Sequence, residues 1–112
     1  TLGSAVQTIG NYAFNNCKKL QGIAIPNSVT SIGSLAFYNC SSLTSIEIPD
    51  SVKNIGIYAF AECKNLTEIT IGDDVETIGA NAFNGCTQLS KVKFGENIKI
   101  IGKAVAFQSA VI

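Results

Sequence analysis

The sequence predicts an α/β repeat solenoid with one parallel strand per 23-residue repeat on one face and short helices or turns on the other. Three observations predict it: apolar residues recur every 23 positions, each copy contains a strand-like segment followed by turn residues, and no copy can enclose its apolar residues alone. The best-defined copy is residues 43–65. The recurring columns are Leu20, Leu43, Leu66 and Leu89; Ile23, Ile46, Ile69 and Val92; Phe14, Phe37, Phe60 and Phe83; and Cys17, Cys40, Cys63 and Cys86.

Each copy begins with a segment in which apolar and polar residues alternate. Residues 66–71, which read LTEITI, show the pattern best, and β-branched side chains dominate it. Stacked in register, such strands form a parallel sheet with a spacing of roughly 4.8 Å. The turn residues that follow read PNS, PDS, GDD and GEN in successive copies. They end the strand.

A second apolar pair in each copy predicts a short extended segment. The pairs are Val6/Ile9, Val29/Ile32, Val52/Ile55, Val75/Ile78 and Ile98/Ile101. A glycine follows each pair, where the backbone needs either a positive φ or a close approach to other backbone. These glycines are Gly10, Gly33, Gly56, Gly79 and Gly102. The A-F-x-x-C motif that comes next is apolar at i, i+1 and i+4, which predicts a helix of one or two turns.

We expect residues 1–112 to form a single solenoid domain of about four full repeats with partial ends. Because Leu2-Gly3 matches the end of a strand such as Ile71-Gly72, we expect the chain to be a fragment of a longer array. The last copy reads IGKAVAF over residues 101–107, one residue longer than the pattern. Either a C-terminal cap begins there, or the array is interrupted and exposes apolar surface.

The composition excludes several classes of function. Eight lysines balance eight acidic residues, and the net charge of zero with no arginine makes nucleic acid an unlikely partner. The chain has no histidine, the commonest general base and metal ligand. No apolar run is long enough to cross a bilayer, so we expect no membrane insertion. We therefore expect no enzymatic activity, no cofactor and no metal.

The four cysteines could suggest zinc or disulfides, but each stands one full repeat from the next, without the close pairs of a zinc site. Stacked equivalents would point inward at one height, a poor geometry for bridging. We interpret them as a ladder of buried free thiols that behave as small hydrophobes.

Acidic residues raise two further possibilities. A column of turn oxygens could hold calcium, although it lacks the spacing of known calcium loops, and a solvated turn edge is the preferred interpretation. Its members are Asn27, Asp50, Asp73 and Glu96, with Asp74 alongside. Paired-carboxylate catalysis would need Glu47 and Glu68, which lie in different columns of an open face that cannot exclude water.

The polar positions of the strands are the candidate ligand-binding residues, because the alternation turns them to solvent. In the first copy they are only Gly22 and Ala24. In the later copies they are Ser45, Glu47, Glu68, Thr70, Lys91 and Lys93. Glu68 and Lys91 should be lateral neighbours able to pair. The competing interpretation is an ordinary solvated sheet face without a ligand.

The pattern LxxIxIPxSVxxIGxxAFxxCxx resembles the BspA-like, or Treponema-type, leucine-rich repeat family over the whole chain. The resemblance implies a right-handed leucine-rich-repeat superhelix. It also implies a non-enzymatic adhesion module of a cell-surface or secreted protein, which would recognise a protein or glycan ligand through the strand face. The alternative is a structural spacer, or a segment that self-associates through exposed repeat ends.

Overall fold

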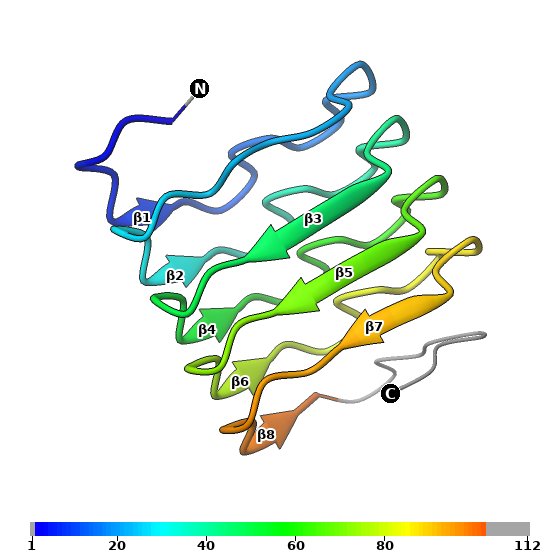
Figure 1. The fold of residues 1–112 in the computed structure, drawn as a ribbon. Coiled ribbons are helices and arrows are strands. Elements are labelled where there is room, and N and C mark those ends of the chain that lie inside the picture. The colour runs from blue at the N-terminus through cyan, green and yellow to red at the C-terminus, as the bar shows by residue number, and fades with distance from the viewer. Residues whose placement is uncertain (1, 103–112) are drawn as a thin grey trace.

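The computed structural model describes residues 2–102, which form a solenoid of stacked coils (Figure 1). We use "coil" for one circuit of the chain. Eight short strands of the described residues lie in two parallel sheets. The five-stranded sheet contains β1 (Thr8–Ile9), β2 (Ser31–Ile32), β4 (Asn54–Ile55), β6 (Thr77–Ile78) and β8 (Ile100–Ile101). The three-stranded sheet contains β3 (Ser45–Ile48), β5 (Glu68–Ile71) and β7 (Lys91–Lys93).

The register of both sheets confirms the repeat. Ser45 pairs with Glu68 and Glu68 pairs with Lys91, a shift of one full repeat at each step. The five-stranded sheet keeps the same shift, as in the pairing of Ile32 with Ile55. Its two-residue strands confirm the short extended segments predicted before each glycine. The strand predicted in the first copy is not formed, because residues 20–25 join neither sheet of the described chain.

The predicted short helices are replaced by turns, and no helix occurs within residues 2–102. An α-helix needs each N–H to bond the carbonyl four residues back. Here alternate N–H groups instead donate to the next coil, as Phe37 does to the Ala59 carbonyl and Phe60 to the Ala82 carbonyl, both at 2.8 Å. Positive φ angles at positions two residues before and after the phenylalanine accompany this alternation. The non-glycine residues concerned are Tyr12, Asn16, Leu35, Asn39, Tyr58, Glu62 and Asn81.

Close backbone approach explains the glycine column. A Cβ added at Gly79 would lie 2.5 Å from the carbonyl carbon of Gly56, one coil earlier. Gly33, Gly56 and Gly102 meet the preceding coil in the same way. None of these glycines has a positive φ. Of the two alternatives that the sequence left open, close approach is therefore the correct one.

The core is a stack of similar layers, one per coil. The phenylalanine rings of successive coils lie parallel to within 10°, with centroids 5.1 Å apart for Phe14–Phe37 and Phe37–Phe60 and 5.7 Å apart for Phe60–Phe83. Leu43 and Leu66 are fully buried beside them. The first layer is less well covered than the others, as the partial burial of Phe14 shows. Each layer is sealed by its neighbours, as a repeat architecture requires.

The irregular last copy, residues 101–107, lies mostly outside the described residues. Neither the predicted cap nor the predicted interruption is tested by the structure.

We predict that Phe60→Ala lowers the free energy of unfolding by about 3–5 kcal/mol, because it removes a ring stacked on both faces and leaves a cavity. Denaturant unfolding followed by circular dichroism measures the change. The control is Ile57→Ala, whose side chain is 49% exposed and should cost less than about 1 kcal/mol. Equal losses for the two variants would contradict the layered core.

Candidate functional site

The six candidate binding residues lie on the outward side of β3, β5 and β7, which we call the strand face. Isoleucines and a valine between them are buried, so the polar residues turn outward. Thr70 is half-buried and the other five are exposed. The register places them in two rows, Ser45–Glu68–Lys91 and Glu47–Thr70–Lys93. The structure therefore brings together all six residues predicted from the sequence.

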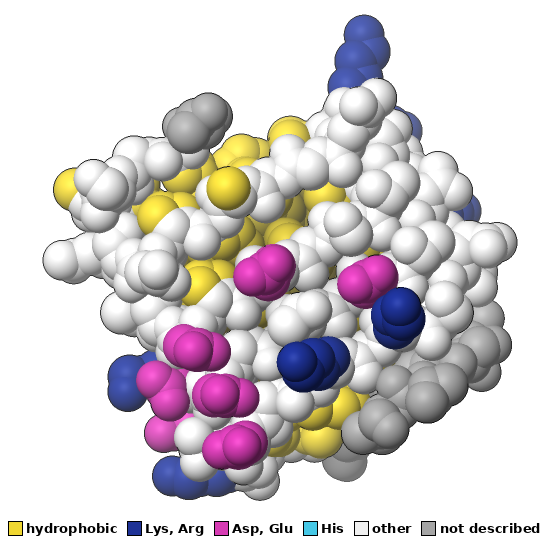
Figure 2. Space-filling model, viewed as in Figure 1, with side chains coloured by type: hydrophobic (Ala, Val, Ile, Leu, Met, Phe, Trp, Pro, Cys, Tyr) yellow, Lys and Arg dark blue, Asp and Glu magenta, His cyan; other side chains and the backbone are white. Residues whose placement is uncertain are grey.

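The charges of the strand face form no ion pairs with other described residues. Glu68 and Lys91 are direct neighbours across β5 and β7, as predicted, and they form no ion pair with each other. Within residues 2–102 the two ion pairs are Lys64–Glu62 and Lys99–Glu76, each 3.8 Å long. Figure 2 shows acidic and lysine side chains side by side on this face. They offer both signs of charge to a partner.

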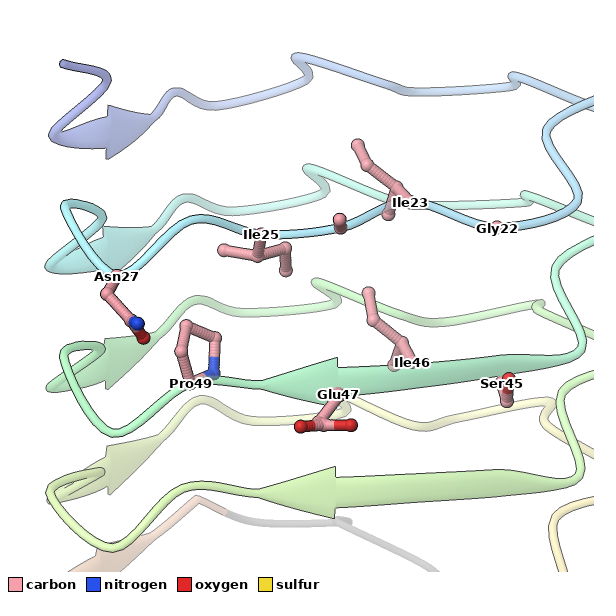
Figure 3. A pocket seen from close by; sticks show the side chains of 9 residues that line it. Gly22, Ile23, Ile25, Asn27, Ser45, Ile46, Glu47 and Pro49 are labelled. Carbon is pink, nitrogen blue, oxygen red and sulfur yellow. The ribbon is translucent and has the colours of Figure 1, made fainter. Parts of the chain in front are cut away.

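Several hollows accompany the face, and one of about 290 Å³ is lined by Glu47, Thr70 and Lys93. A larger one, about 590 Å³, is a groove between residues 22–25 and β3 (Figure 3). Its outer rim holds the small residues Gly22, Ala24 and Ser45, and Glu47 lines it from β3. A third hollow of about 420 Å³ lies over β5 and β7 and ends at Phe94.

The sequence analysis did not predict the groove, although the sequence contains a signal for it. Residues with low strand propensity, Gly22 and Ala24, stand where the later copies have polar or β-branched residues. Among the strands predicted within the described residues, the one over residues 20–25 fails to pair.

The acidic turn column has a structural role. Oδ1 of Asp50 accepts a hydrogen bond of 2.8 Å from the Asp73 N–H in the next coil. The Asn97 amide then donates to the Asp73 carbonyl at 2.9 Å. Across the described residues, no three cysteine, aspartate or glutamate side chains gather in a way that could hold a metal ion. The Asp50 and Asn97 side chains therefore link turns of neighbouring coils.

The thiols also link neighbouring coils. Cys40, Cys63 and Cys86 are buried as predicted, whereas Cys17 is only half-buried. The three buried thiols are more than small hydrophobes, because each donates to the carbonyl of the phenylalanine one coil earlier. The Cys63–Phe37 and Cys86–Phe60 distances are both 3.1 Å. Burial raises the pKa of Cys40 to about 11, so this thiol stays protonated and keeps its donor at neutral pH.

The fold and the strand face together define the class of protein. The chain is a parallel β-solenoid with one repeat per coil and an open polar sheet on one side. Residues 1–111 match the model of the BspA type leucine rich repeat region in six copies. The chain belongs to this leucine-rich repeat family. Repeat proteins of this kind are generally protein-interaction modules and typically lack enzymatic activity.

Solved structures agree with this assignment. A leucine rich repeat protein of T. pallidum has a TM-score of 0.79 and 29% identity, over 88% of this chain. A leucine-rich repeat protein from Eubacterium ventriosum has a TM-score of 0.75 and 34% identity, over 80% of this chain. A leucine rich cell surface protein from Faecalibacterium prausnitzii has a TM-score of 0.56 and 27% identity, over 91%.

The chain is shorter than these relatives. It spans 57%, 24% and 41% of the three solved chains, respectively. A comparison with curated proteins gave no match. Within the described part of the chain, no helix has the length and apolar character needed to cross a membrane.

We predict that stability falls as pH rises from 9 towards 11. The native state raises the pKa of Cys40 from 9.0 to about 11, so above pH 9 the unfolded chain releases this proton first and is favoured. Below pH 9 both states keep the proton and this thiol contributes no pH dependence. Denaturant unfolding in reducing buffer at pH 8, 9 and 10.5 measures the effect.

The control for this prediction is Cys40→Ala, which should lose less stability between pH 8 and 10.5 than the parent chain does. A decline of the same size in both chains would assign the effect to other groups.

Proposed function

We propose that the chain is a protein-binding module of a surface or secreted repeat protein, and that it recognises a protein or glycan ligand through the strand face. The binding residues are Ser45, Glu47, Glu68, Thr70, Lys91 and Lys93. The family is the first support, since leucine-rich repeats generally mediate protein interaction. In this proposal the module binds its ligand and does not catalyse a reaction.

The observation that carries the proposal is that the charged side chains of the strand face form no ion pairs with other described residues. Long side chains of opposite sign stand on adjacent strands, and none of them forms an ion pair with another described residue. A ligand with complementary charges can therefore pair with them without first breaking contacts inside the protein. The small hollow beside them at Phe94 adds apolar surface for a contact.

Location at the cell surface is the second part of the proposal. One similar structure is described as a leucine rich cell surface protein. The strand face has no aromatic side chain among its six residues, so we expect affinity to come from several weak contacts rather than from one anchor. Such a surface suits adhesion through many repeats acting together.

We predict that binding to a ligand found in a screen of matrix proteins and glycans falls at least about tenfold in the variant Glu47→Gln/Glu68→Gln/Lys91→Gln/Lys93→Gln, because the charges of the strand face are removed. Biolayer interferometry measures the loss. Binding to the parent chain should also weaken as salt is raised.

The matched control removes two lysines and two acids from other exposed positions, as Lys18→Gln/Lys19→Gln/Asp74→Asn/Glu96→Gln. It should bind like the parent. If the two variants bind equally well, the strand face is not the binding surface.

A second candidate function is self-association through the repeat ends. An apolar hollow of about 200 Å³ lies at the first coil, lined by Leu2, Phe14, Leu20 and residues 22–24. Phe14 and Leu20 are partly buried there, whereas their equivalents Phe37 and Leu43 are fully buried. A second copy of the chain could cover this surface.

Self-association predicts a concentration-dependent increase in mass that Leu20→Lys abolishes, because a charge cannot be buried unpaired in an apolar contact. Multi-angle light scattering from micromolar to millimolar concentration measures it. A monomer throughout this range would reject the idea.

A further inference from the structure

Asparagine side chains link the coils at several places. Of the ten asparagines in the chain, six have a side-chain amide that takes part in a hydrogen bond to a neighbouring coil. These six are Asn11, Asn16, Asn39, Asn54, Asn65 and Asn97. The side chains of the other four form no hydrogen bond with a described residue, and they are Asn15, Asn27, Asn81 and Asn84. A free side-chain amide is the one able to turn towards its own backbone.

The backbone nitrogen after each free asparagine is the second requirement. Asparagine is a chemically labile residue, because the next backbone nitrogen can attack its side-chain carbonyl carbon. The N–H after Asn15 already donates to the Tyr38 carbonyl at 2.8 Å. The N–H after Asn81 donates to the Gly79 carbonyl at 3.3 Å. Both nitrogens are held in place, so neither is positioned for such an attack.

Asn27 and Asn84 remain, and they differ in the residue that follows. Within residues 2–102 the N–H groups of Ser28 and Gly85 form no hydrogen bond. Ser28 has a side chain that shields its nitrogen, and its hydroxyl donates to the Val6 carbonyl. Gly85 has no side chain, and Asn84 before it is exposed. Among the described asparagines, Asn84 therefore combines a free amide with an open nitrogen beside it.

The fold itself favours glycine after Asn84. In the three preceding coils the equivalent residues are Asn16, Asn39 and Glu62, and their φ angles are 61°, 59° and 61°. Gly85 has a φ of 79°. Glycine adopts this left-handed region at no steric cost. The turn geometry thus selects the residue that makes Asn84 reactive.

We propose that Asn84 is a site of spontaneous deamidation in the folded chain. The Gly85 nitrogen forms a bond to Cγ of Asn84, and the side-chain nitrogen of Asn84 leaves as ammonia with the proton that the Gly85 nitrogen loses. The product is a five-membered succinimide ring. Water opens the ring at either carbonyl and gives aspartate or isoaspartate. Water is the only co-reactant, and nothing is oxidised or reduced.

Both products place a new carboxylate beside an existing one. A Cβ added at Gly85 would meet the carboxylate of Glu62 in the preceding coil. The Glu62 N–H also donates to the Asn84 carbonyl at 2.7 Å. Lys64, 3.8 Å from Glu62, is the cation nearest to this pair in the described ion pairs. Deamidation therefore changes the charge of the turn from one acidic group to two.

Isoaspartate has a further effect on packing, because its main chain runs through the side-chain carbon and gains one atom. The turn has little room for that atom. Before it, the Phe83 ring stacks on Phe60 at 5.7 Å. After it, the buried Cys86 thiol donates to the Phe60 carbonyl at 3.1 Å. We expect the isoaspartate form to be less stable than the aspartate form, which keeps the normal main chain.

The first experiment incubates the whole chain in mildly alkaline buffer and compares it with an unincubated sample. Digestion after lysine releases residues 65–91, which contain Asn65, Asn81 and Asn84. Fragmentation mass spectrometry locates each lost amide, and labelling by an isoaspartyl methyltransferase detects isoaspartate. Asn84 should react several-fold faster than Asn65 and Asn81. A rate at Asn84 no higher than at Asn81 would overturn the proposal.

The variant Gly85→Asn tests the role of the open nitrogen. Asparagine occupies the equivalent position with a positive φ at Asn16 and Asn39, and the new side chain meets only the mobile end of Glu62. The reaction at Asn84 should slow several-fold while circular dichroism shows a folded chain. Thr87→Asn, at an exposed position of the same turn, is the matched control and should react like the parent. Unchanged loss of the Asn84 amide in Gly85→Asn would overturn the proposal.

The second experiment separates the two products by chromatography and measures the denaturant midpoint of each. Asn84→Asp is the matched control, because it carries the same charge without the additional main-chain atom. The isoaspartate form should unfold at a lower denaturant concentration than this variant. Equal midpoints would contradict the expected effect on packing.

Asn84 lies in a turn outside the strand face, so this modification is independent of the proposed binding function. The four-fold strand-face variant should lose the Asn84 amide at the same rate as the parent chain. A changed rate in that variant would contradict this independence.

Discussion

Hydrogen bonding between residues one coil apart is the constraint on which the rest of this structure depends. A short segment has no room to satisfy its own backbone, so each coil gives donors to a neighbour in two sheets and in the turns. Side chains follow the same rule, as the Asp50 carboxylate and the Cys63 thiol show. Because every ladder runs along the stack, a coil without a neighbour loses all of them together. Stability therefore belongs to the pair of coils and not to the single coil.

The hydrogen bonds bring the backbones of neighbouring coils so close that they restrict which residues fit at several positions. Glycine is needed at Gly79 because any Cβ would strike the backbone of Gly56. The same spacing stacks the phenylalanine rings at 5.1 and 5.7 Å, within the range for aromatic contact. The interior thus uses the same residues in each layer, and variation is left to the surface. The proposed recognition therefore uses positions such as Glu47 and Lys93, which differ between copies.

Much of the fold could be predicted, because burial imposes a period that is visible in the sequence. The apolar columns indicated the register, and the alternation in the strands placed Glu68 and Lys91 side by side on the outer surface. The turns were misjudged, since the spacing of Ala36, Phe37 and Cys40 follows burial at a corner rather than a helix. Positive φ at residues such as Leu35 has no clear sequence signal. The ion pairs could not be predicted from the sequence either, because two oppositely charged residues on adjacent strands do not necessarily form one.

The constant shift of one repeat between paired strands also bears on how such a protein can change in length. Duplicating or deleting a stretch of one repeat's length, wherever it begins, returns every donor to an equivalent acceptor and every ring to an equivalent ring. A change of any other size would misalign both sheets and the turns at once. Unequal recombination between copies therefore preserves the fold only when it adds or removes a whole number of repeats. Lineages can lengthen or shorten the array readily, while the outward residues of each new copy are free to diverge.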